Sequence, residues 1–263
     1  MSASGSTAVV TGAAGGIGQA IAHRLATEGF RLVLADLDPA VEAVASALGA
    51  AAVVGDCASE AGVDGLVERS FAELGRVDVF FANAGTDVGR GLDTPESAWA
   101  TALEVNVLAH VRAARLLVPH WLEHEGGRFV VTASAAGLLT MLGSAPYSVS
   151  KHGAVAFAEW LRATYGHRGI VVQAICPQGV RTRMLDEAGP LKELLSRDRA
   201  LEPEQVADVV WEALQGERFL VLPHPEVAGY YQARAADPDG WLAGMGRLQA
   251  KLDAGARPCG RGG

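Results

Sequence analysis

Lysine, cysteine and aromatic residues are scarce in this chain of 263 residues. Only three lysines occur, and the formal net charge at pH 7 is −8. Proteins that bind nucleic acid or an anionic membrane surface need basic patches, so we expect neither kind of partner. The three cysteines, Cys57, Cys176 and Cys259, lie far apart, without the spacing of a metal site or a disulfide framework. We therefore expect no bound metal and a reducing, cytoplasmic location.

Long hydrophobic runs are absent as well. No apolar stretch approaches the roughly 18 residues that a membrane-spanning helix needs, so no membrane span is expected. Residues 1–6 lack the charged and apolar regions of a signal peptide. The chain has instead 49% hydrophobic and 20% charged residues, a balance typical of a soluble globular protein.

Short apolar strands alternate with amphipathic helices, and this alternation predicts a parallel sheet with helices on both faces. The strands are expected at 7–11, 31–35, 51–55, 77–82, 127–133, 170–176 and 219–222. The helices are expected at 16–28, from about 39, and at 60–74, 96–124, 147–166 and 203–214. The predicted fold class is α/β, a doubly wound parallel sheet in three layers.

The pattern changes near the C-terminus. We expect one domain over residues 1–263, with its core at about 6–222 and a mostly helical lid at 183–199. Residues 223–254 are expected to form an appendage that contains a helical run, and 255–263 a disordered tail.

A glycine-rich loop joins the first predicted strand to the first predicted helix. Gly12 allows a tight turn, Gly16 lets the backbone approach a pyrophosphate, and Gly18 permits close packing of helix and strand. The N-terminus of the helix then offers free N–H groups and a positive dipole end to phosphate. The sequence therefore predicts a dinucleotide site here, with a simple tight turn as the alternative.

Asp36 ends the second predicted strand, about 20 residues after this loop, where an acidic residue can bind the adenosine ribose. Its carboxylate would repel a 2′-phosphate, and no basic residue in the loop or at Leu37 would receive one. We therefore expect NAD(H) rather than NADP(H). Alternatively, Asp36 caps the helix near Pro39, although Asp38 is better placed for that role.

Tyr147 and Lys151 are four residues apart on the helix predicted to begin at Tyr147, so they share one helix face. A nearby ammonium favours the phenolate and is expected to lower the pKa of the tyrosine. The pair alone is weak support for a catalytic site, because such pairs also arise on ordinary helices.

Further polar residues follow predicted strands or lie within apolar helices. Asp56 follows the third strand and either touches the adenine or shapes its loop. Asn106 lies in an apolar helix, where an amide needs partners, and a packed structural role is its alternative. His224, between two prolines, is either catalytic or structural.

Together these motifs resemble the short-chain dehydrogenase/reductase family, over about residues 6–222. The matching motifs are Thr11-Gly-Ala-Ala-Gly-Gly-Ile-Gly18, Asn83-Ala-Gly85, Asn106, Ser134 and Tyr147-x-x-x-Lys151. Chain length and the glycine spacing are similar to the compact single-domain branch and unlike the longer epimerase branch. The resemblance implies a Rossmann fold and hydride transfer between a secondary alcohol and the nicotinamide of NAD.

The resemblance also implies individual roles. Tyr147 would be the general acid/base, Lys151 would bind the nicotinamide ribose and lower the tyrosine pKa, Ser134 would bind the substrate oxygen, and Asn106 would hold a water of a proton relay. The residues implied to contact NAD are Gly12, Gly16, Ile17, Gly18, Asp36, Asp56, Cys57, Asn83, Gly85, Tyr147, Lys151, Val180 and Thr182.

One position departs from the family pattern: Gln178 stands where a glycine commonly follows the proline after the sixth strand. Gln178 either contacts the substrate or points outward. The wall of the expected substrate pocket is apolar and consists of Ala136, Leu138, Met141, Leu142 and Leu185, which suits a largely apolar alcohol or ketone. Arg181 and Arg183 would suit an anionic substrate tail instead.

We also expect a homotetramer built on the helices at 96–124 and 147–166, because both carry more apolar side chains than one core-facing stripe needs. These side chains are Trp99, Leu103, Val107, Val111, Leu116, Leu117, Val149, Val155, Phe157 and Trp160. A catalytically idle NAD-binding sensor or interaction protein is the alternative function.

Overall fold

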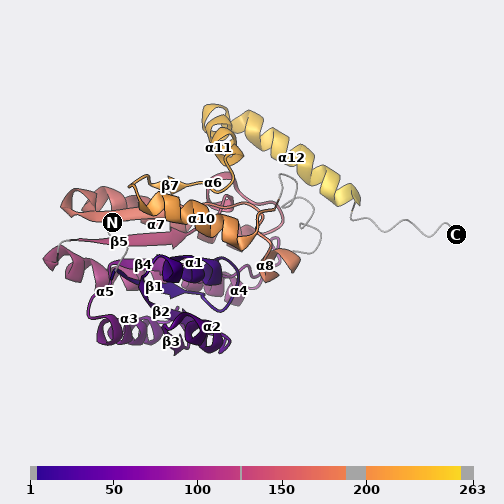
Figure 1. Ribbon diagram of the computed structural model, residues 1–263. Helices are drawn as coiled ribbons and strands as arrows, with labels where there is room; N and C mark the ends of the chain where they lie inside the picture. The colour runs from indigo at the N-terminus through magenta and orange to yellow at the C-terminus, as the bar shows by residue number, and fades with distance from the viewer. Residues whose placement is uncertain (1–4, 125, 188–199, 256–263) are drawn as a thin grey trace.

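A computed structural model of the protein describes residues 5–124, 126–187 and 200–255. Its centre is a sheet of seven parallel strands in the order β3-β2-β1-β4-β5-β6-β7 (Figure 1). The strands are β1 (Thr7–Thr11), β2 (Arg31–Asp36), β3 (Ala51–Val54), β4 (Val79–Ala82), β5 (Gly127–Thr132), β6 (Ile170–Ile175) and β7 (Leu220–Val221). The predicted α/β class and parallel sheet are confirmed.

Helices connect the strands and cover both faces of the sheet (Figure 1). They are α1 (Gly16–Thr27), α2 (Val41–Leu48), α3 (Glu60–Leu74), α4 (Glu96–Leu103), α5 (Ala109–Glu123), α6 (Ala136–Leu139), α7 (Ala145–Tyr165), α8 (Arg183–Asp186), α10 (Pro203–Leu214), α11 (Glu226–Ala236) and α12 (Pro238–Gly255). A π-helix, η1 (Glu104–Leu108), joins α4 to α5, and a short 3-10 helix, η2 (Gly166–Arg168), follows α7.

Two hydrophobic clusters, one on each face, make the three layers. Successive strand residues point to opposite faces, so Val9 packs in the cluster beneath α3, α5 and α7, whereas Ala8 and Val10 pack beneath α1, α2 and α10. Trp121 on one face and Ile21 on the other are among the largest fully buried side chains. With both faces covered, the strands are apolar throughout.

The strand order reverses between β1 and β4. The connection after β1 runs outward to β2 and β3, and the chain then returns to pair β4 with the other side of β1. In open parallel sheets, ligands bind beyond the carboxyl ends of the strands at such a switch point. This topology therefore places the loops after Thr11 and Ala82 side by side.

Two helix predictions differ from the structure in ways that matter for the site. The long helix expected at 96–124 is interrupted by η1, a wider turn that contains the fully buried Asn106. Its side chain bonds both the N–H and the C=O of Thr86, 20 residues away, and such bonds favour the wider turn. The helix expected to begin at Tyr147 begins two residues earlier, at Ala145.

The C-terminal region contains more helix than expected. The run predicted at 239–252 extends over the whole of α12, so Gly255 belongs to this helix rather than to a disordered tail. A second helix, α11, precedes it, and the rings of Tyr230 and Trp241 meet with centroids 6.4 Å apart. Of the predicted lid, α8 and Glu187 are described, and residues 188–199 lie outside the described part.

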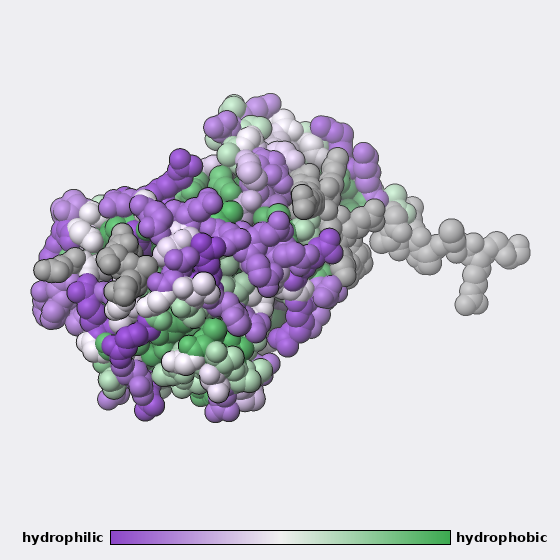
Figure 2. Space-filling model, in the orientation of Figure 1, coloured by the Kyte–Doolittle hydropathy of each residue, from purple (hydrophilic) through white to green (hydrophobic). Residues whose placement is uncertain are grey.

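The surface in the orientation of Figure 1 is mostly hydrophilic, with a smaller apolar area over α2 and β3 (Figure 2). Within the described residues, no helix is long and apolar enough to cross a membrane. The same residues contain no group of three or more His, Cys, Asp or Glu side chains that could hold a metal ion.

Candidate functional site

The glycine loop after β1 lies where added side chains would collide with neighbouring loops. A Cβ on Gly12, whose φ is +66°, would lie 2.8 Å from Ala84 Cα, and one on Gly18 would overlap the Gly12 carbonyl oxygen. A Cβ on Gly16, whose φ is +55°, would lie 3.0 Å from Thr182 Cγ2. Gly12 and Gly16 therefore require glycine for both conformation and space, whereas Gly18 requires it for space alone.

The N-terminus of α1 follows this loop at once, with Ile17 in its first turn. Its N-cap residue, Gly15, has no side chain to cap the helix, and the first N–H groups of a helix have no intrahelical acceptor. No acidic residue lies in the first turn. A pyrophosphate fits this arrangement, because bare N–H groups and the helix dipole both attract an anion.

Asp36 is half-buried at the end of β2 and faces the same loop. One carboxylate oxygen accepts a hydrogen bond from the N–H of Ala14 at 2.9 Å, and the other accepts from the N–H of Asp38 at 3.0 Å. Each oxygen keeps a lone pair for a ribose hydroxyl. Neither aspartate caps α2, whose N-cap residue is Ala40 without a side-chain cap; the Asp38 carboxylate accepts from the N–H of Ala40 at 3.0 Å in the turn before the helix.

Asp56 shapes its own loop. Its carboxylate accepts from the N–H of Ala58 at 2.8 Å and of Ser59 at 3.3 Å, and the Ala58 bond is the main cause of its lowered pKa. The neighbouring Cys57 is half-buried, and burial raises the pKa of its thiol to about 12. This favours the loop role for Asp56, while its exposed position leaves it within reach of a bound ligand.

Thr11 ties the two loops at the switch point together. Its hydroxyl accepts hydrogen bonds from the N–H groups of Asn83 and Ala84, both at 3.0 Å, and donates to Phe81 O at 3.1 Å. The Asn83 amide donates to the carbonyls of Thr11 and Gly12, at 2.9 and 3.2 Å. The glycine loop is therefore held in place before any ligand binds.

The loop after β6 approaches the glycine loop from the other side. Thr182 lies against Gly16, and its hydroxyl donates to Val180 O at 3.2 Å. Val180 is buried and pairs with Leu201 in an isolated parallel bridge. The predicted cofactor residues Gly16 and Thr182 of the two loops thus lie side by side.

Asn106, Gly85 and Lys151 meet at the end of β4. A Cβ on Gly85 would lie 3.2 Å from both Asn106 Oδ1 and Lys151 Nζ. The Asn106 amide also donates to the Ser150 hydroxyl at 2.9 Å, and Asn106 is fully buried. The expected convergence of Asn106 and Lys151 is therefore present.

Tyr147 and Lys151 share one face of α7 as the spacing predicts. The ammonium lies 5.7 Å from the centre of the tyrosine ring and donates to Thr132 O at 2.9 Å. Ser134, two residues after β5, is half-buried, accepts from the N–H of Ala136 at 3.0 Å and donates to Pro177 O at 3.5 Å. Hydrogen bonding to Ser134 is one of the influences on the Tyr147 hydroxyl.

In the protein alone the pKa of Tyr147 is raised, and its lowering by Lys151 together with the positive charge of the oxidised nicotinamide stays a prediction. Burial raises the pKa of Tyr147 to about 12, and Ser134 opposes this only in part. Burial also lowers the pKa of Lys151 to about 8. Desolvation penalises both charged forms, and in a dry site it outweighs the attraction within one pair.

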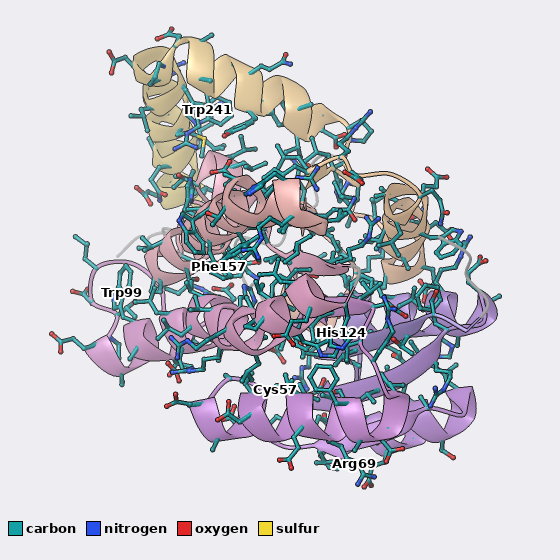
Figure 3. All side chains as sticks on the ribbon, turned by 90° about the vertical axis from the view of Figure 1, so that its left-hand side faces the viewer. Cys57, Arg69, Trp99, His124, Phe157 and Trp241 are labelled. Carbon is teal, nitrogen blue, oxygen red and sulfur yellow. The ribbon has the colours of Figure 1, made fainter. Side chains whose placement is uncertain are left out.

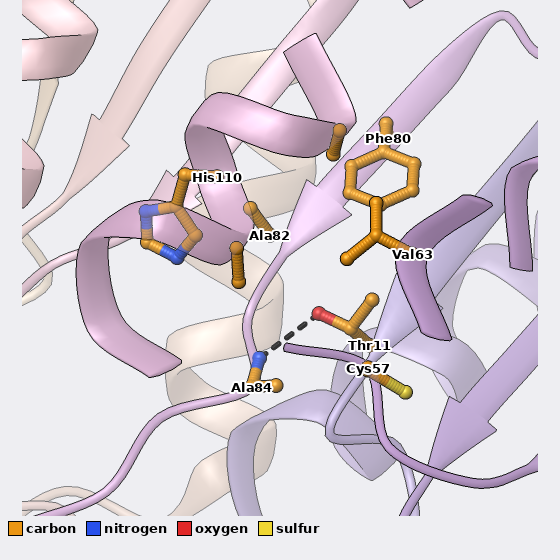
Figure 4. A pocket seen from close by; sticks show the side chains of 9 residues that line it. Thr11, Cys57, Val63, Phe80, Ala82, Ala84 and His110 are labelled. Atoms are coloured by element: carbon orange, nitrogen blue, oxygen red, sulfur yellow. Dashed lines mark hydrogen bonds between the residues drawn. The ribbon is translucent and has the colours of Figure 1, made fainter. Parts of the chain in front are cut away.

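A small pocket lies behind the switch point (Figure 4). His110 lies on one side of it, and Cys57 and Thr11 lie on the other. Both ring nitrogens of His110 lack a hydrogen-bond partner among the described residues, and burial lowers the pKa of this histidine to about 3. Ser134, Tyr147 and Lys151 do not line this pocket, so it is not the site where they converge.

Several polar residues at the site were not singled out from the sequence. Ser144, just before α7, donates to Asp87 Oδ1 at 2.8 Å, and Asp87 further raises the tyrosine pKa. Ser150 and Thr132 bond Asn106 and Lys151. Their only sequence signal is closeness to a motif, since short polar residues are common throughout the chain.

Comparisons with known proteins agree with this geometry. A family model described as short chain dehydrogenase matches residues 6–192. The 1-deoxy-11-beta-hydroxypentalenate dehydrogenase of Streptomyces exfoliatus is 36% identical over 229 residues, 83% of this chain and 83% of that protein. The meso-2,3-butanediol dehydrogenase of Serratia marcescens is 34% identical over 212 residues, 77% of this chain and 84% of that protein.

The crystal structure of a short-chain dehydrogenase/reductase from Burkholderia phymatum in complex with NAD has a similar fold. Its TM-score is 0.84 at 29% identity, and the match covers 91% of this chain and 96% of that one. The matched family model spans well over half of the chain and includes the glycine loop, Asn106, Ser134, Tyr147 and Lys151. The chain therefore belongs to the short-chain dehydrogenase/reductase family of oxidoreductases.

Proposed function

We propose that the protein is an NAD(H)-dependent oxidoreductase that interconverts a secondary alcohol and a ketone. The observation that carries this proposal is the convergence of Ser134, Tyr147, Lys151 and Asn106 at the carboxyl ends of β4 and β5, beside the glycine loop. Packing alone does not require a buried lysine beside a tyrosine, because burying an ammonium costs free energy.

The reaction moves a hydride and a proton separately. A bound NAD would supply the acceptor for the hydride of the carbinol carbon and, in its oxidised form, a positive charge beside Tyr147. Ser134 donates a hydrogen bond to the substrate oxygen, and the Tyr147 phenolate takes the hydroxyl proton. In the reverse direction the Tyr147 phenol returns that proton to the carbonyl oxygen.

Tyr147 needs help to act as a base near neutral pH. Lowering its pKa from about 12 to about 7 requires roughly 7 kcal/mol of phenolate stabilisation. One positive charge at about 6 Å supplies roughly 3 kcal/mol at an effective dielectric constant of about 20. Lys151 alone is therefore insufficient, whereas Lys151 and the oxidised nicotinamide together come close.

Lys151 would also bind the nicotinamide ribose, and Asn106 would hold the water that carries the proton onward. The residues that would hold the rest of the cofactor are Gly12, Gly16, Ile17, Gly18, Asp36, Asp56, Cys57, Asn83, Gly85, Val180 and Thr182. The preference for NAD(H) rests on the Asp36 carboxylate, which would repel a 2′-phosphate.

The substrate is proposed to be largely apolar. The proposal rests on the apolar wall predicted from the sequence, of which Ala136, Leu138 and Leu185 are buried in the structure. The alternative of an anionic tail is disfavoured, because Arg181 and Arg183 are exposed and pair with nearby glutamates. The Streptomyces and Serratia relatives are named for 1-deoxy-11-beta-hydroxypentalenate and meso-2,3-butanediol, and both names denote hydroxyl compounds.

A panel of alcohols tests the proposal. The purified protein is incubated with NAD and with meso-2,3-butanediol, cyclohexanol, a bicyclic terpene alcohol and a hydroxy acid, and NADH formation is followed by absorbance. We expect turnover of at least one apolar secondary alcohol. NADH binding without turnover of any panel member, in either direction, would favour the idle sensor instead.

We also propose a homotetramer assembled through α7 and the interrupted helix α4–η1–α5, which packs beside it. Trp99 and Phe157 lie on the face seen in Figure 3. Leu103, Leu108, Val149 and Trp160 are exposed there, with 38, 42, 50 and 55% of their surfaces accessible. Large exposed apolar patches mark interfaces.

Two residues expected in this patch do not belong to it, because Leu117 and Val155 are buried in the core of the subunit. The apolar side chains that remain exposed on these helices are not covered by any other part of the described subunit. Light scattering at micromolar concentration tests the assembly. A molar mass near 27.3 kDa, that of a single chain, would contradict the proposed assembly. A stable dimer would support only one of the interfaces that a tetramer needs.

A further inference from the structure

The peptide group between Pro177 and Gln178 lies next to the candidate catalytic serine. Its carbonyl oxygen accepts a hydrogen bond from the N–H of Ala135 at 2.8 Å and from the Ser134 hydroxyl at 3.5 Å. The orientation of this one peptide plane therefore sets where the Ser134 side chain and its backbone lie.

The other edge of the same peptide is held by a histidine from a distant loop. The N–H of Gln178 donates to His224 Nδ1 at 3.2 Å, across 46 residues of sequence. In a trans peptide the C=O and the N–H point in opposite directions. The plane is thus fixed between Ser134 on one side and His224 on the other.

The histidine is well placed to hold that peptide still. His224 is 2% exposed and follows β7, which pairs with β6 immediately before Pro177. Prolines on both sides limit the backbone, and His224 O accepts from the N–H of Val227 in the first turn of α11 at 3.1 Å. Because an N–H donor must meet a lone pair, Nδ1 carries no proton and the ring proton is on Nε2.

The far half of the loop is held independently of the histidine. The N–H of Leu201 donates to Gly179 O at 3.1 Å, and the N–H of Arg181 donates to Leu201 O at 2.8 Å. Val180 and Thr182, the loop residues that are predicted to contact the cofactor, lie on this half. Loss of the histidine bond should therefore disturb the serine end of the loop more than the cofactor end.

We propose that His224 is a positioning residue for the reaction. As the neutral tautomer with its proton on Nε2, it fixes the Pro177–Gln178 peptide and, through that carbonyl, the hydroxyl of Ser134. This rests on the proposed function, since Ser134 matters for rate only if it binds the substrate oxygen. Gln178 accordingly acts here through its backbone N–H rather than through its side chain.

Three variants separate this role from simple packing. His224→Asn keeps an acceptor, since Oδ1 is as many bonds from the backbone as Nδ1 of histidine is. His224→Gln moves its acceptor one bond farther out, and His224→Leu removes it while keeping an apolar side chain of similar size. The first variant is the matched control for the other two.

Hydrogen–deuterium exchange of the full-length protein tests the bond without any need for activity. We expect the Gln178 amide, resolved in overlapping peptides of the segment 175–182, to exchange about tenfold faster in the Leu and Gln variants than in the wild type or the Asn variant. Equal protection in all four proteins would overturn the proposal, whether or not the protein turns over an alcohol.

Steady-state kinetics test the consequence. With a secondary alcohol oxidised by the wild type, kcat/KM should fall about 10- to 100-fold in the Leu and Gln variants and stay within about threefold in the Asn variant. The Kd for NADH should stay within about threefold in all of them. Equal losses in the Asn and Leu variants, or losses confined to NADH binding, would contradict a positioning role. Faster amide exchange with an unchanged kcat/KM would show that His224 does not act on the reaction through Ser134. That result would not contradict the proposed reaction.

Discussion

The part of the site beyond strands β1 to β3 and the part beyond strands β4 to β6 consist of different chemical groups. Beyond β1 to β3 the contact surface consists of glycines, bare N–H groups and carboxylates such as Asp36, which remain accessible. Beyond β4 to β6 it consists of side chains such as Asn106 and Lys151, which are at most 3% exposed. Asn106 donates to the Ser150 hydroxyl and Lys151 to the Thr132 carbonyl oxygen.

This difference follows from what each half has to do. A pyrophosphate carries its charge throughout the reaction, so a surface of fixed dipoles suffices and no proton need move. Proton transfer requires a group whose charge changes, and burial makes that change sensitive to nearby charges. The protein alone therefore keeps Tyr147 in its neutral form, with a pKa raised to about 12.

The largest expected effect lies in the buried half. Tyr147→Phe deletes only the hydroxyl that exchanges the proton, so kcat should fall about 100- to 10,000-fold. The glycine loop and Asp36 are untouched, and NADH should bind with a Kd within about threefold of that of the wild type. Steady-state kinetics and NADH fluorescence titration measure the two quantities.

The matched control is Tyr165→Phe, a hydroxyl deletion at the other end of α7. We expect it to leave kcat nearly unchanged. If Tyr147→Phe kept more than about a tenth of the wild-type kcat, general acid/base catalysis by Tyr147 would be excluded.

His110 provides a test of how dry the pocket behind the switch point is. Its pKa in the folded protein is about 3, against 6.5 as its ordinary value. Between these values the unfolded chain binds a proton that the folded protein does not, so stability falls as the pH drops from 6.5 toward 3. At about pH 4 this amounts to roughly 3 kcal/mol of unfolding free energy.

His110→Leu should remove that contribution. Urea unfolding of wild type and variant should therefore give a free-energy difference that shifts by about 3 kcal/mol in favour of the variant between pH 7 and pH 4. The exposed His23, replaced by Leu, serves as the control and should show a much smaller shift. A constant difference between wild type and His110→Leu would mean that water reaches the histidine.

The same comparison explains what the sequence could predict. The glycine spacing and Asp36 were informative because a tight turn and a strand end fix their positions within about 25 residues. The Tyr147–Lys151 pair was predictable because helix geometry alone places residues four apart on one face. Local geometry accounts for each of these predictions.

The features that the sequence did not reveal depend on distant partners. The π-helical turn at Asn106 depends on bonds to Thr86, and the His224–Gln178 bond spans 46 residues. The direction of the Tyr147 pKa shift depends on burial, and burial cannot be read from the sequence spacing of Tyr147 and Lys151.

In the glycine loop, a matched pair of substitutions tests how closely the backbone of the loop packs against its neighbours. A methyl group on Gly18 would overlap the Gly12 carbonyl oxygen, whereas one on Gly15 meets nothing within 4 Å. Gly15 has an extended conformation, with φ −167°, that alanine adopts readily. We expect Gly18→Ala to cost about 1 to 3 kcal/mol of stability and Gly15→Ala almost nothing.

Thermal unfolding of the two variants, with and without NADH, checks this expectation. Stabilisation by NADH should persist in Gly15→Ala and weaken in Gly18→Ala, since the displaced loop no longer presents its N–H groups correctly. Equal behaviour of the two variants would mean that the loop adapts to a side chain and is not held by Thr11 and Asn83.

The smallest expected effect concerns which cofactor the accessible half selects. Asp36 should make the protein prefer NAD(H) over NADP(H) by at least about tenfold in kcat/KM, a difference of about 1.4 kcal/mol. Asp36→Ala removes the repulsion of a 2′-phosphate but also the support that the carboxylate gives to the N–H groups of Ala14 and Asp38. We therefore expect weaker use of NAD(H) together with a smaller preference. Asp36→Asn keeps one of the two acceptors without the charge, so it should retain more NAD(H) binding than Asp36→Ala and still lose most of the discrimination. If the wild type used NADP(H) equally well or better, charge at Asp36 would not be what selects the cofactor.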